Sequence, residues 1–466
     1  MYRLKIMGVY KMVTMSIFME GPCTMNSWTV YIKEFGKIEE ASIRPAPLTL
    51  FIGDNNSGKS YIMTLIYGLW TVDFIADNFH FPEHSQVYES CLKISEKLIK
   101  QCTKNLKLTY TLHGKELLLF QQLINELFSE NKKLFLKKLF NKKMDIEELR
   151  IEFPSTASFC FEIGMEKSFD EETSYRIMGN NYGWGLTGAD RKPDHKLAER
   201  QLACMLQRML QWDTVRPVYF PTARTGFLLT YKELTRSALH ERFSVGENAK
   251  NLLTKPTTDF LMSLSSIEAD HYYRRCPEIL SFIEQHIISG HVSVSAYPVD
   301  VKYQPAETEE SLPMYVASSV VTEVVPLLLF LQHRSLLGAI MIEEPEISLH
   351  PQLQWEMARV LIRLMNKGMP VIVTTHSDII LQHINNMIKA EQMHQKDRFF
   401  EETGYEKEDL LAKGQVTVYQ FEEQKNGKTH LTKLPCGDDG FEAMTFYNTL
   451  KKLNEQIDLI EHEREQ

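Results

Sequence analysis

The stretch Leu48-Thr-Leu-Phe-Ile-Gly53-Asp-Asn-Asn-Ser-Gly58-Lys59-Ser60 constrains the fold more than any other part of this 466-residue chain. A short apolar run ends in glycine, and a glycine-lysine-serine then opens a segment with apolar residues at helical spacing. Residues 53–60 match the pattern G-x-x-x-x-G-K-[ST]. Its glycines permit a tight turn whose backbone N–H groups point at phosphate oxygens, at the positive end of the following helix. The stretch therefore predicts a strand, a phosphate-binding loop (P-loop) and a helix in succession.

The same pattern assigns roles to individual loop residues. Lys59 is expected to reach the β- and γ-phosphates of a nucleotide, and the Ser60 hydroxyl is expected to bind Mg²⁺. The other residues expected to contact the nucleotide are Gly53, Asn55, Asn56, Ser57, Gly58 and Tyr61. A chance match is the alternative, but the motif here stands between an expected strand and an expected helix, as its chemistry requires.

Two later apolar runs end in polar residues that can complete such a site. Residues 335–342 lead to Glu343-Glu344-Pro345-Glu346, and residues 370–375 lead to His376. Continuous apolar runs are typical of central parallel strands covered on both faces. One carboxylate at such a strand end can belong to a Mg²⁺ shell, and the next can polarise water. Each run alone fits an acidic turn or a structural histidine, but the three together predict one active site at the carboxyl edge of a sheet.

These motifs resemble the ABC-type ATPase heads of SMC, RecF and OLD-family proteins, and more narrowly the compact bacterial ATPases of anti-phage systems such as PARIS and Septu. Residues 340–351 look like the I-E-E-P-E-x-x-L-H-P run of that group. The resemblance implies an α/β fold, an ABC-type P-loop ATPase head with a mixed sheet core and a β lobe, interrupted by helical insertions. It implies ATP and Mg²⁺ as cofactors, with Ser60 and Glu343 at the metal, Glu344 as general base and His376 as γ-phosphate sensor.

A third motif concerns a second subunit. Residues 317–323 align with the signature motif of these ATPases, which caps the ATP of the opposite subunit, so Ser318 and Ser319 are the expected contacts in trans. The usual signature has glycine after its serine, whereas Ser319 and Val320 occupy that place here. The motif implies a homodimer or a higher homo-oligomer. Arg224 lies in a segment that resembles the family, but its role is open, and no glutamine is assigned to the Q-loop.

Composition bounds the rest of the chain. Apolar residues make up 43% and charged residues 24%, as in soluble globular proteins, and the length predicts two or three subdomains. No apolar run reaches the length of a membrane span, so no membrane partner is expected. Seven scattered cysteines without a C-x-x-C pair favour reduced thiols in a cytoplasmic protein.

We expect the chain to divide into seven parts. A hairpin is expected at 291–296 and 299–303, and a Gly- and Asn-rich loop at 179–194. The parts are an uncertain N-terminal extension (1–27), the N-terminal lobe of the head (28–70), a lysine-rich helical insertion (71–149), β segments of the head with a loop (150–226), a helical subdomain (227–290), the C-terminal lobe (291–435) and an acidic C-terminal helix (436–466).

Charge is unevenly distributed over a net value of −9. Residues 91–150 carry 13 lysines and arginines against 7 acidic residues. Six lysines cluster there, and they fit either a solvated helix face or a surface that contacts the phosphate backbone of DNA. They are Lys132, Lys133, Lys137, Lys138, Lys142 and Lys143.

The resulting expectation is an ATPase that acts as a sensor or scaffold subunit in anti-phage defence, through DNA or through a partner effector such as a nuclease or toxin. Lys59 and Glu343 are too far apart in the sequence for a small P-loop kinase. Two alternatives stay open. One is an OLD-like repair ATPase associated with a nuclease, and the other is a nucleotide-gated scaffold with negligible turnover.

Overall fold

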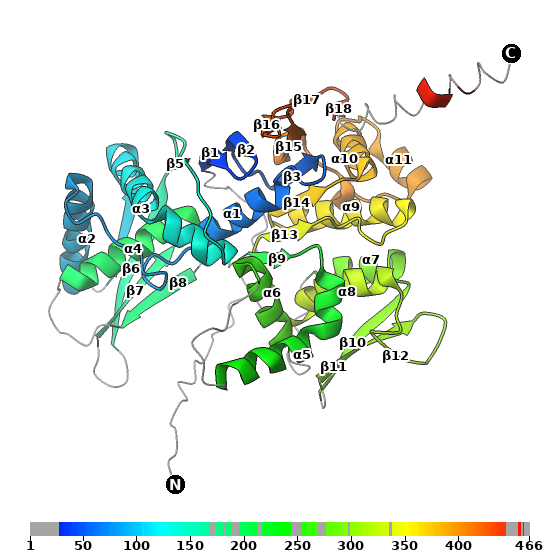
Figure 1. Ribbon diagram of the computed structural model, residues 1–466, viewed down its shortest axis with the longest axis horizontal. Helices are drawn as coiled ribbons and strands as arrows, with labels where there is room; N and C mark the ends of the chain where they lie inside the picture. The colour runs from blue at the N-terminus through cyan, green and yellow to red at the C-terminus, as the bar shows by residue number, and fades with distance from the viewer. Residues whose placement is uncertain are drawn as a thin grey trace, which may run out of the picture.

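A mixed sheet of nine strands forms the centre of the part of the chain that the computed structural model describes (Figure 1). That part comprises residues 28–105, 107–167, 173–179, 182–187, 195–211, 217–243, 253–267, 276–296, 299–334, 338–443, 455–457 and 460. The strand order is β5-β1-β2-β16-β15-β3-β14-β13-β9. In chain order the strands are β1 (Thr29–Phe35), β2 (Ile38–Ile43), β3 (Leu48–Gly53), β5 (Glu148–Glu152), β9 (Val218–Phe220), β13 (Ile340–Glu343), β14 (Val371–Thr375), β15 (Val416–Glu423) and β16 (Thr429–Lys433).

Five neighbouring strands of this sheet run parallel. β3 pairs with β15 on one side and with β14 on the other, β14 pairs with β13, and β13 pairs with β9. Every residue of β3, β13 and β14 is buried, as the continuous apolar runs predicted. Because parallel strands share one carboxyl edge, the residues after β3, β13 and β14 meet there. The expected fold class, α/β with a mixed sheet core interrupted by helical insertions, is confirmed.

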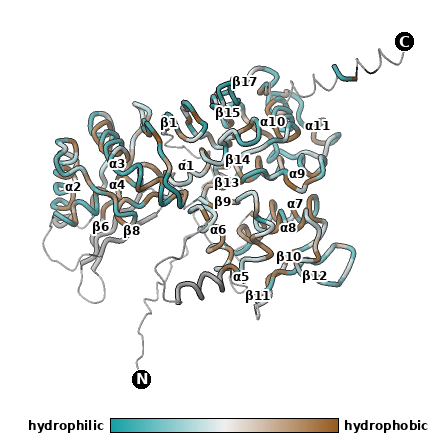
Figure 2. The backbone as a smooth tube through the Cα atoms, viewed as in Figure 1, coloured by the Kyte–Doolittle hydropathy of each residue, from teal (hydrophilic) through white to brown (hydrophobic). Residues whose placement is uncertain are grey.

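Helices cover both faces of the sheet and bury two hydrophobic cores. Along β3, Phe51 joins the core on the side of α1 (Lys59–Thr71), whereas Leu50 and Ile52 join the opposite core. That second core is closed by α8 (Ser319–His333), α9 (Pro351–Asn366) and α10 (Asp378–Glu391). Along α9 and α10, hydrophobic and hydrophilic turns alternate (Figure 2), as expected of helices that lie on a core with one face in solvent.

Between α1 and β9 the chain builds a separate lobe. Its helices are α2 (Gln86–Asn105), α3 (Gly114–Phe140) and α4 (His195–Leu210). Beside them lies a four-stranded sheet, within the described residues, of β4 (Lys107–Leu112), β6 (Phe159–Lys167), β7 (Thr173–Gly179) and β8 (Tyr182–Thr187). α3 packs directly on α1, since a Cβ added to Gly68 would lie only 2.6 Å from the Leu139 side chain.

This lobe differs from the sequence expectation in two respects. β4 interrupts the expected helical insertion at 71–149, and β6, β7 and β8 form a sheet with β4 instead of joining the nine-stranded sheet. The expected loop at 179–194 is also wrong in part, because residues 182–187 are strand β8, paired with β7. These pairings join distant segments, and local propensity does not report them.

A second lobe follows β9. It contains α5 (Arg224–Phe243), α6 (Lys255–Ser265), α7 (Pro277–His286) and a small sheet of β10 (Gly290–Ala296), β11 (Val299–Pro305) and β12 (Leu312–Pro313). The expected hairpin is confirmed, since β10 pairs antiparallel with β11. The lobe ends in α8, which returns the chain to the sheet at β13.

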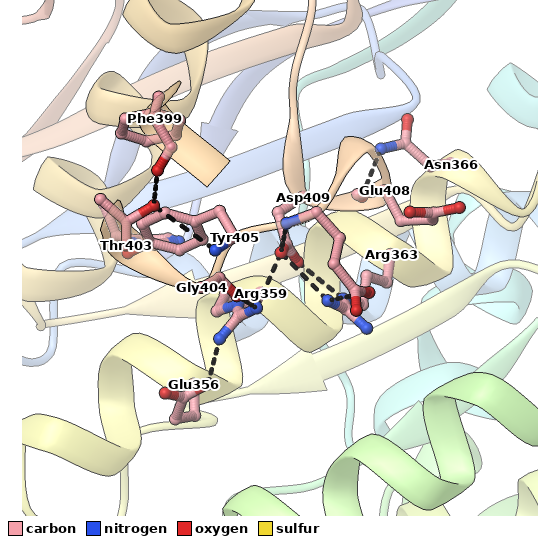
Figure 3. Close-up of polar contacts among 12 residues, drawn as sticks. Glu356, Arg359, Arg363, Asn366, Phe399, Thr403, Gly404, Tyr405, Glu408 and Asp409 are labelled. Carbon is pink, nitrogen blue, oxygen red and sulfur yellow. Dashed lines mark hydrogen bonds and ion pairs between the residues drawn. The ribbon is translucent and has the colours of Figure 1, made fainter. Parts of the chain in front are cut away.

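The C-terminal segment fastens α9 in place. After α11 (Lys396–Thr403), a short 3₁₀ helix, η1 (Lys407–Asp409), brings Asp409 against two arginines of α9. Figure 3 shows both guanidinium groups pointing at the Asp409 carboxylate, with Arg359 Nη2 at 2.8 Å and Arg363 Nε at 2.6 Å. All three side chains are buried. α9 begins seven residues after Glu344. The network therefore anchors the helix that follows residues 343–346, which we call the acidic turn.

The last part of the chain departs from the expected acidic helix at 436–466. Residues 436–437 and 440–441 form β17 (Cys436–Gly437) and β18 (Gly440–Phe441). Most of the residues beyond 443, the expected N-terminal extension 1–27 and residues 335–337 of the expected strand lie outside the described residues. No helix in the described part of the chain has the length and apolar character needed to cross a membrane.

Candidate active site

The phosphate-binding loop connects β3 to α1 and depends on two glycines with positive φ. Gly53 has φ 129°, and a Cβ there would lie 2.1 Å from the backbone oxygen of Phe421 on β15. Gly58 has φ 97°, and a Cβ there would lie 3.1 Å from Ile38. Both positions therefore exclude a side chain, the first by close approach of a neighbouring strand and the second by backbone conformation.

Lys59 folds back over its own loop. Its Nζ donates to the backbone oxygens of Gly53 at 3.0 Å and Asp54 at 2.6 Å, and to Ser57 Oγ at 3.3 Å. The lysine is buried, and this burial lowers its pKa to about 8 although the charges of Glu344, Asp54 and Glu346 act in the opposite direction. The ammonium is therefore held at the loop by weak neutral acceptors, which phosphate oxygens can replace.

The other predicted loop residues differ in exposure. Ser57 is buried, and Gly58 is half-buried. Asn55, Asn56, Ser60 and Tyr61 are exposed at the carboxyl edge of the sheet. The Tyr61 ring packs against Phe35 and Phe140, with centroid distances of 6.1 and 5.7 Å, and the two phenylalanine rings also contact each other at 5.7 Å. The end of α3 is thereby packed beside the start of α1.

Glu343 is the last residue of β13, and its carboxylate is held by the segment that follows β9. Its Oε2 accepts hydrogen bonds from the backbone N and from Oγ1 of Thr222, both at 3.1 Å. Thr222 follows β9, the strand next to β13. Glu343 also acts on Tyr219, whose pKa is raised well above its usual value, first by burial and then by this carboxylate.

Glu344 and His376 face each other at the ends of β13 and β14. His376 Nε2 lies 3.5 Å from Glu344 Oε1, and both side chains keep partial access to solvent. Glu344 has φ 44°, a left-handed conformation rare for this residue type, and its backbone N donates to the Thr374 oxygen at 2.8 Å. The hydrogen bond with His376, and further the charges of His376, Lys59 and Arg224, lower the pKa of Glu344. Glu344 therefore stays ionised and can accept a proton.

Glu346, to which no role is assigned from the sequence, also takes part in the site. Its Oε1 accepts the backbone N–H of His376 at 2.5 Å, and burial raises the pKa of this carboxyl. The signal that could have found it is its place three residues after a strand end, opposite a histidine at the end of the next strand. Thr222 carries no comparable signal, because its contact with Glu343 depends on the pairing of β9 with β13.

The signature residues lie at the N-terminal end of α8. Ser318 is the N-cap, and its Oγ accepts the backbone N–H of Val321 at 3.4 Å. Both Ser318 and Ser319 are exposed, as are Tyr315 and Val316 just before them, with exposed fractions of 79% and 57%. The two serine hydroxyls are thus available to an external partner at a helix N-terminus.

Arg224, at the start of α5, lies beneath the acidic turn. Its guanidinium donates to the backbone oxygen of Glu343 at 2.7 Å and to that of Glu344 at 3.1 Å. Arg224, whose role is open from the sequence, is therefore in direct contact with the backbone of the predicted Mg²⁺ ligand Glu343 and of the predicted general base Glu344.

The sequence profile of the AAA ATPase domain family matches residues 25–195 and 230–381. The chain belongs to this family. The two matched segments of the AAA ATPase domain contain the P-loop, the acidic turn and His376, whereas β9 and Arg224 lie between them. None of the curated proteins compared with the chain matches it significantly.

Solved structures of SMC heads are also similar to this AAA ATPase chain. One is the SMC head domain from Thermotoga maritima, at 12% identity and a TM-score of 0.34, with 88% of this chain and 100% of that chain covered. Another is the Smc head domain with an extended coiled coil bound to the C-terminal domain of ScpA, derived from Pyrococcus furiosus, at 11% identity and a TM-score of 0.34, covering 93% and 99%. Because these values are low, the family membership depends on the sequence match alone.

Proposed function

We propose that this protein binds ATP at the P-loop and hydrolyses it to ADP and phosphate. The observation that carries the proposal is the pair Glu344 and His376, 3.5 Å apart at the ends of neighbouring strands, on the edge where Lys59 caps the P-loop. A carboxylate kept ionised by its neighbours can take the proton of an attacking water. Lys59 supplies the charge for the β- and γ-phosphates.

Each remaining residue has a distinct part in this mechanism. Glu344 orients water and accepts its proton, and His376 holds the Glu344 carboxylate while its exposed face senses the γ-phosphate. Glu346 fixes the backbone of His376. Backbone N–H groups of the loop, including those of Asn55, Asn56, Ser57 and Gly58, bind phosphate oxygens as in other P-loops.

The residues present fit Mg²⁺. Ser60 and Glu343 offer a hydroxyl and a carboxylate oxygen, the hard ligands that Mg²⁺ prefers. In the described part of the chain, no group of three or more histidine, cysteine, aspartate or glutamate residues could hold a metal ion by itself. This fits a cation that is held by one or two protein groups together with phosphates and water. When bound, Mg²⁺ neutralises the charge that develops on the phosphates.

Substitution of Lys59 tests this function. Lys59→Ala removes a charge-assisted contact worth about 1.5–3 kcal/mol, so the affinity for ATP should fall by about 10- to 100-fold and turnover should be lost. Lys428→Ala is the matched control, because Lys428 pairs with Glu34 at the surface. Titration with a fluorescent ATP analogue and phosphate release are the measurements. Unchanged turnover in Lys59→Ala would refute the assignment of this loop.

We further propose that ATP joins two copies of the chain, with Ser318 and Ser319 of one copy facing the nucleotide of the other. Three features support this: the exposed serines, the N–H groups at the N-terminal end of α8, and the exposed apolar side chains of Tyr315 and Val316 beside them. The proposed partner beyond a second copy is an effector protein such as a nuclease or toxin, as the resemblance of residues 340–351 to the ATPases of anti-phage systems implies.

The anti-phage role and the DNA contact are proposals of the same kind. The run I-E-E-P-E-x-x-L-H-P supports the first, since it resembles the ATPases of such systems. For DNA, Lys133, Lys137, Lys138, Lys142 and Lys143 are exposed at and just after the end of α3, and Lys132 is half-buried. Lys132 and Lys138 also donate to the backbone oxygens of Glu147 and Asp77. Because Phe140 contacts Tyr61, this lysine-rich end adjoins the P-loop helix.

The two alternatives differ in what supports them. An OLD-like nuclease needs a catalytic domain after His376, but β15 and β16 in that segment complete the ATPase sheet. Asp438 and Asp439 form the turn between β17 and β18. The described residues from 377 to 443 therefore continue the ATPase head. A scaffold with negligible turnover shares every binding residue, and phosphate release with and without DNA distinguishes it.

A further inference from the structure

We propose that Arg224 is a positioning residue that couples the signature end of α8 to the catalytic Glu344, through a buried ion pair with Glu323. The inference depends on the proposed role of Glu344 in hydrolysis and adds a link between that residue and the surface that meets a second subunit. It predicts that contact of Ser318 and Ser319 with a second subunit changes the position of Glu344, through side chains buried within the same chain as the serines.

The contacts of Arg224 are specific to its planar guanidinium. Nη1 donates to the Glu343 oxygen at 2.7 Å, and Nη2 donates to the Glu344 oxygen at 3.1 Å. Nη2 also pairs with Glu323 Oε1 at 2.6 Å, and Nε donates to the backbone oxygen of Glu323 at 3.2 Å. One side chain thus bridges two consecutive peptide groups of the acidic turn and both the backbone and the side chain of one helical residue. A lysine ammonium carries the same charge but lacks this fork.

The bridge holds Glu344 in an unfavourable conformation. A left-handed backbone at a non-glycine residue persists only where its surroundings enforce it. Here the Glu344 N–H is fixed by Thr374 and its C=O by Arg224. The two bonds set the orientation of the peptide groups on either side of Glu344, and therefore the direction in which the carboxylate meets His376. Loss of one of them lets the carboxylate move without any change in the P-loop.

The other end of the bridge lies in the first turns of α8. Glu323 is one helical turn after Ser319, and both of its carboxylate oxygens are held. Thr225 Oγ1 donates to Glu323 Oε2, and Arg224 Nη2 pairs with Oε1. Thr322 Oγ1 bonds the Ser319 oxygen at 3.1 Å. A shift of the exposed serines therefore carries Glu323 with it. Arg224 and Glu323 are both nearly inaccessible to solvent, with 4% and 3% exposed, so water cannot replace the lost contact.

A purely structural ion pair would be equally buried. Its loss would lower the stability of the fold but would not change the orientation of the Glu344 carboxylate. The two readings differ in kinetics. A structural role lowers the fraction of folded enzyme, so the remaining folded molecules keep their turnover rate. A positioning role lowers the turnover rate of folded, nucleotide-bound enzyme, because a displacement of about 1 Å at a reacting group can cost about 10²-fold.

Arg224→Lys is the test, with Arg334→Lys as matched control. Arg334 is the C-cap of α8, the helix that contains Glu323, and it contacts Ser263 and the Phe330 ring, away from the acidic turn. We expect Arg224→Lys to bind an ATP analogue within about twofold of wild type and to lose about 10-fold or more in kcat, with KM little changed. Arg334→Lys should keep kcat. Equal kcat in wild type and Arg224→Lys, or an equal loss in both variants, overturns the inference.

A second measurement does not depend on turnover. Hydrogen exchange of the amides at 343–347 and 318–323 should slow together in wild type when ATP and Mg²⁺ are added, and only one of the two segments should respond in Arg224→Lys. Should Arg224→Lys fail to fold, Glu323→Gln replaces it in both measurements. If wild type binds ATP without hydrolysis, the proposed hydrolysis fails while the exchange comparison still decides the link. Coupled protection that persists in the variant refutes it.

Discussion

Asp409 offers the sharpest test of what holds the C-terminal side of the site together. Its carboxylate is fully buried and accepts bonds from Arg359 Nη2 at 2.8 Å, from Arg363 Nε at 2.6 Å and Nη2 at 3.0 Å, and from the backbone N of Glu406 at 3.0 Å. Asp409→Ala leaves two buried guanidinium groups without their shared anion. Removing one partner of a buried pair costs about 3–5 kcal/mol.

The structure places the expected loss near the lower end of that range. Arg359 keeps Glu356 at 3.1 Å, and Arg363 keeps Glu406 at 3.0 Å. Both guanidinium groups also lie over the Phe282 ring, at 4.6 and 4.1 Å from its centroid. These contacts compensate part of the lost charge, so we expect a loss of about 3 kcal/mol in the free energy of unfolding.

Denaturant unfolding followed by tryptophan fluorescence measures this loss. The Trp355 ring lies 6.1 Å from the Tyr405 ring beside the network, so one of the five tryptophans of the chain reports this region. Glu406→Ala is the control, because that side chain is 62% exposed and its pair with Arg363 is worth at most about 1 kcal/mol. If Asp409→Ala costs no more than Glu406→Ala, the network does not hold α9 in the way described.

Three further predictions concern catalysis, pH and nucleic acid. Glu344→Gln should retain ATP and Mg²⁺ binding, lose hydrolysis by about 10²–10⁴-fold and accumulate a dimer in light scattering. Glu343→Gln should instead weaken Mg²⁺-dependent binding of ATP. Hydrolysis that survives in Glu344→Gln would exclude Glu344 as the base. Burial, and then the charge of Arg359, lower the pKa of His383 to about 4 from 6.5, so the free energy of unfolding should fall by up to about 3 kcal/mol as the pH drops from 6.5 through 4. His383→Gln should lack this part of the pH dependence. An equal pH dependence of unfolding in wild type and His383→Gln would refute the prediction. DNA affinity should be steeply salt-dependent and should collapse when the exposed lysines within residues 132–143 become glutamate; they are Lys133, Lys137, Lys138, Lys142 and Lys143. Binding that is absent, or that the substitutions leave unaltered, would mean that these lysines form a solvated face.

The sequence predicted best what is local or periodic. The P-loop, the buried strands β13 and β14 and the hairpin β10–β11 were each readable from a few consecutive residues. The parallel pairing of β3, β14 and β13 follows from their continuous apolar runs. The glycines among residues 182–187 predict a loop, although Tyr182, Trp184 and Leu186 alternate with the period of a strand. Pairing with β7 makes this segment a strand.

Pairings between distant segments were not readable in the same way. β4 pairs with β6 although the whole of α3 lies between them in the sequence, so the residues of neither segment alone predict the sheet that the two form. The role of Arg224 depends on contacts with Glu323 and with the turn after β13, both far along the chain. The burial of Glu346 likewise depends on β14 lying next to β13. In each case the missing information is which strands become neighbours.

The position of β3 in the sheet has a consequence for synthesis of the chain. Its two neighbours, β14 and β15, are among the last parts of the sheet to leave the ribosome, and the Phe421 carbonyl of β15 closes directly on Gly53. While β1, β2 and the α2–α4 lobe can already pack, β3 still exposes both of its edges, which is the state most prone to pairing with other chains. A nascent chain therefore carries a complete P-loop sequence long before it has a P-loop that can grip a nucleotide.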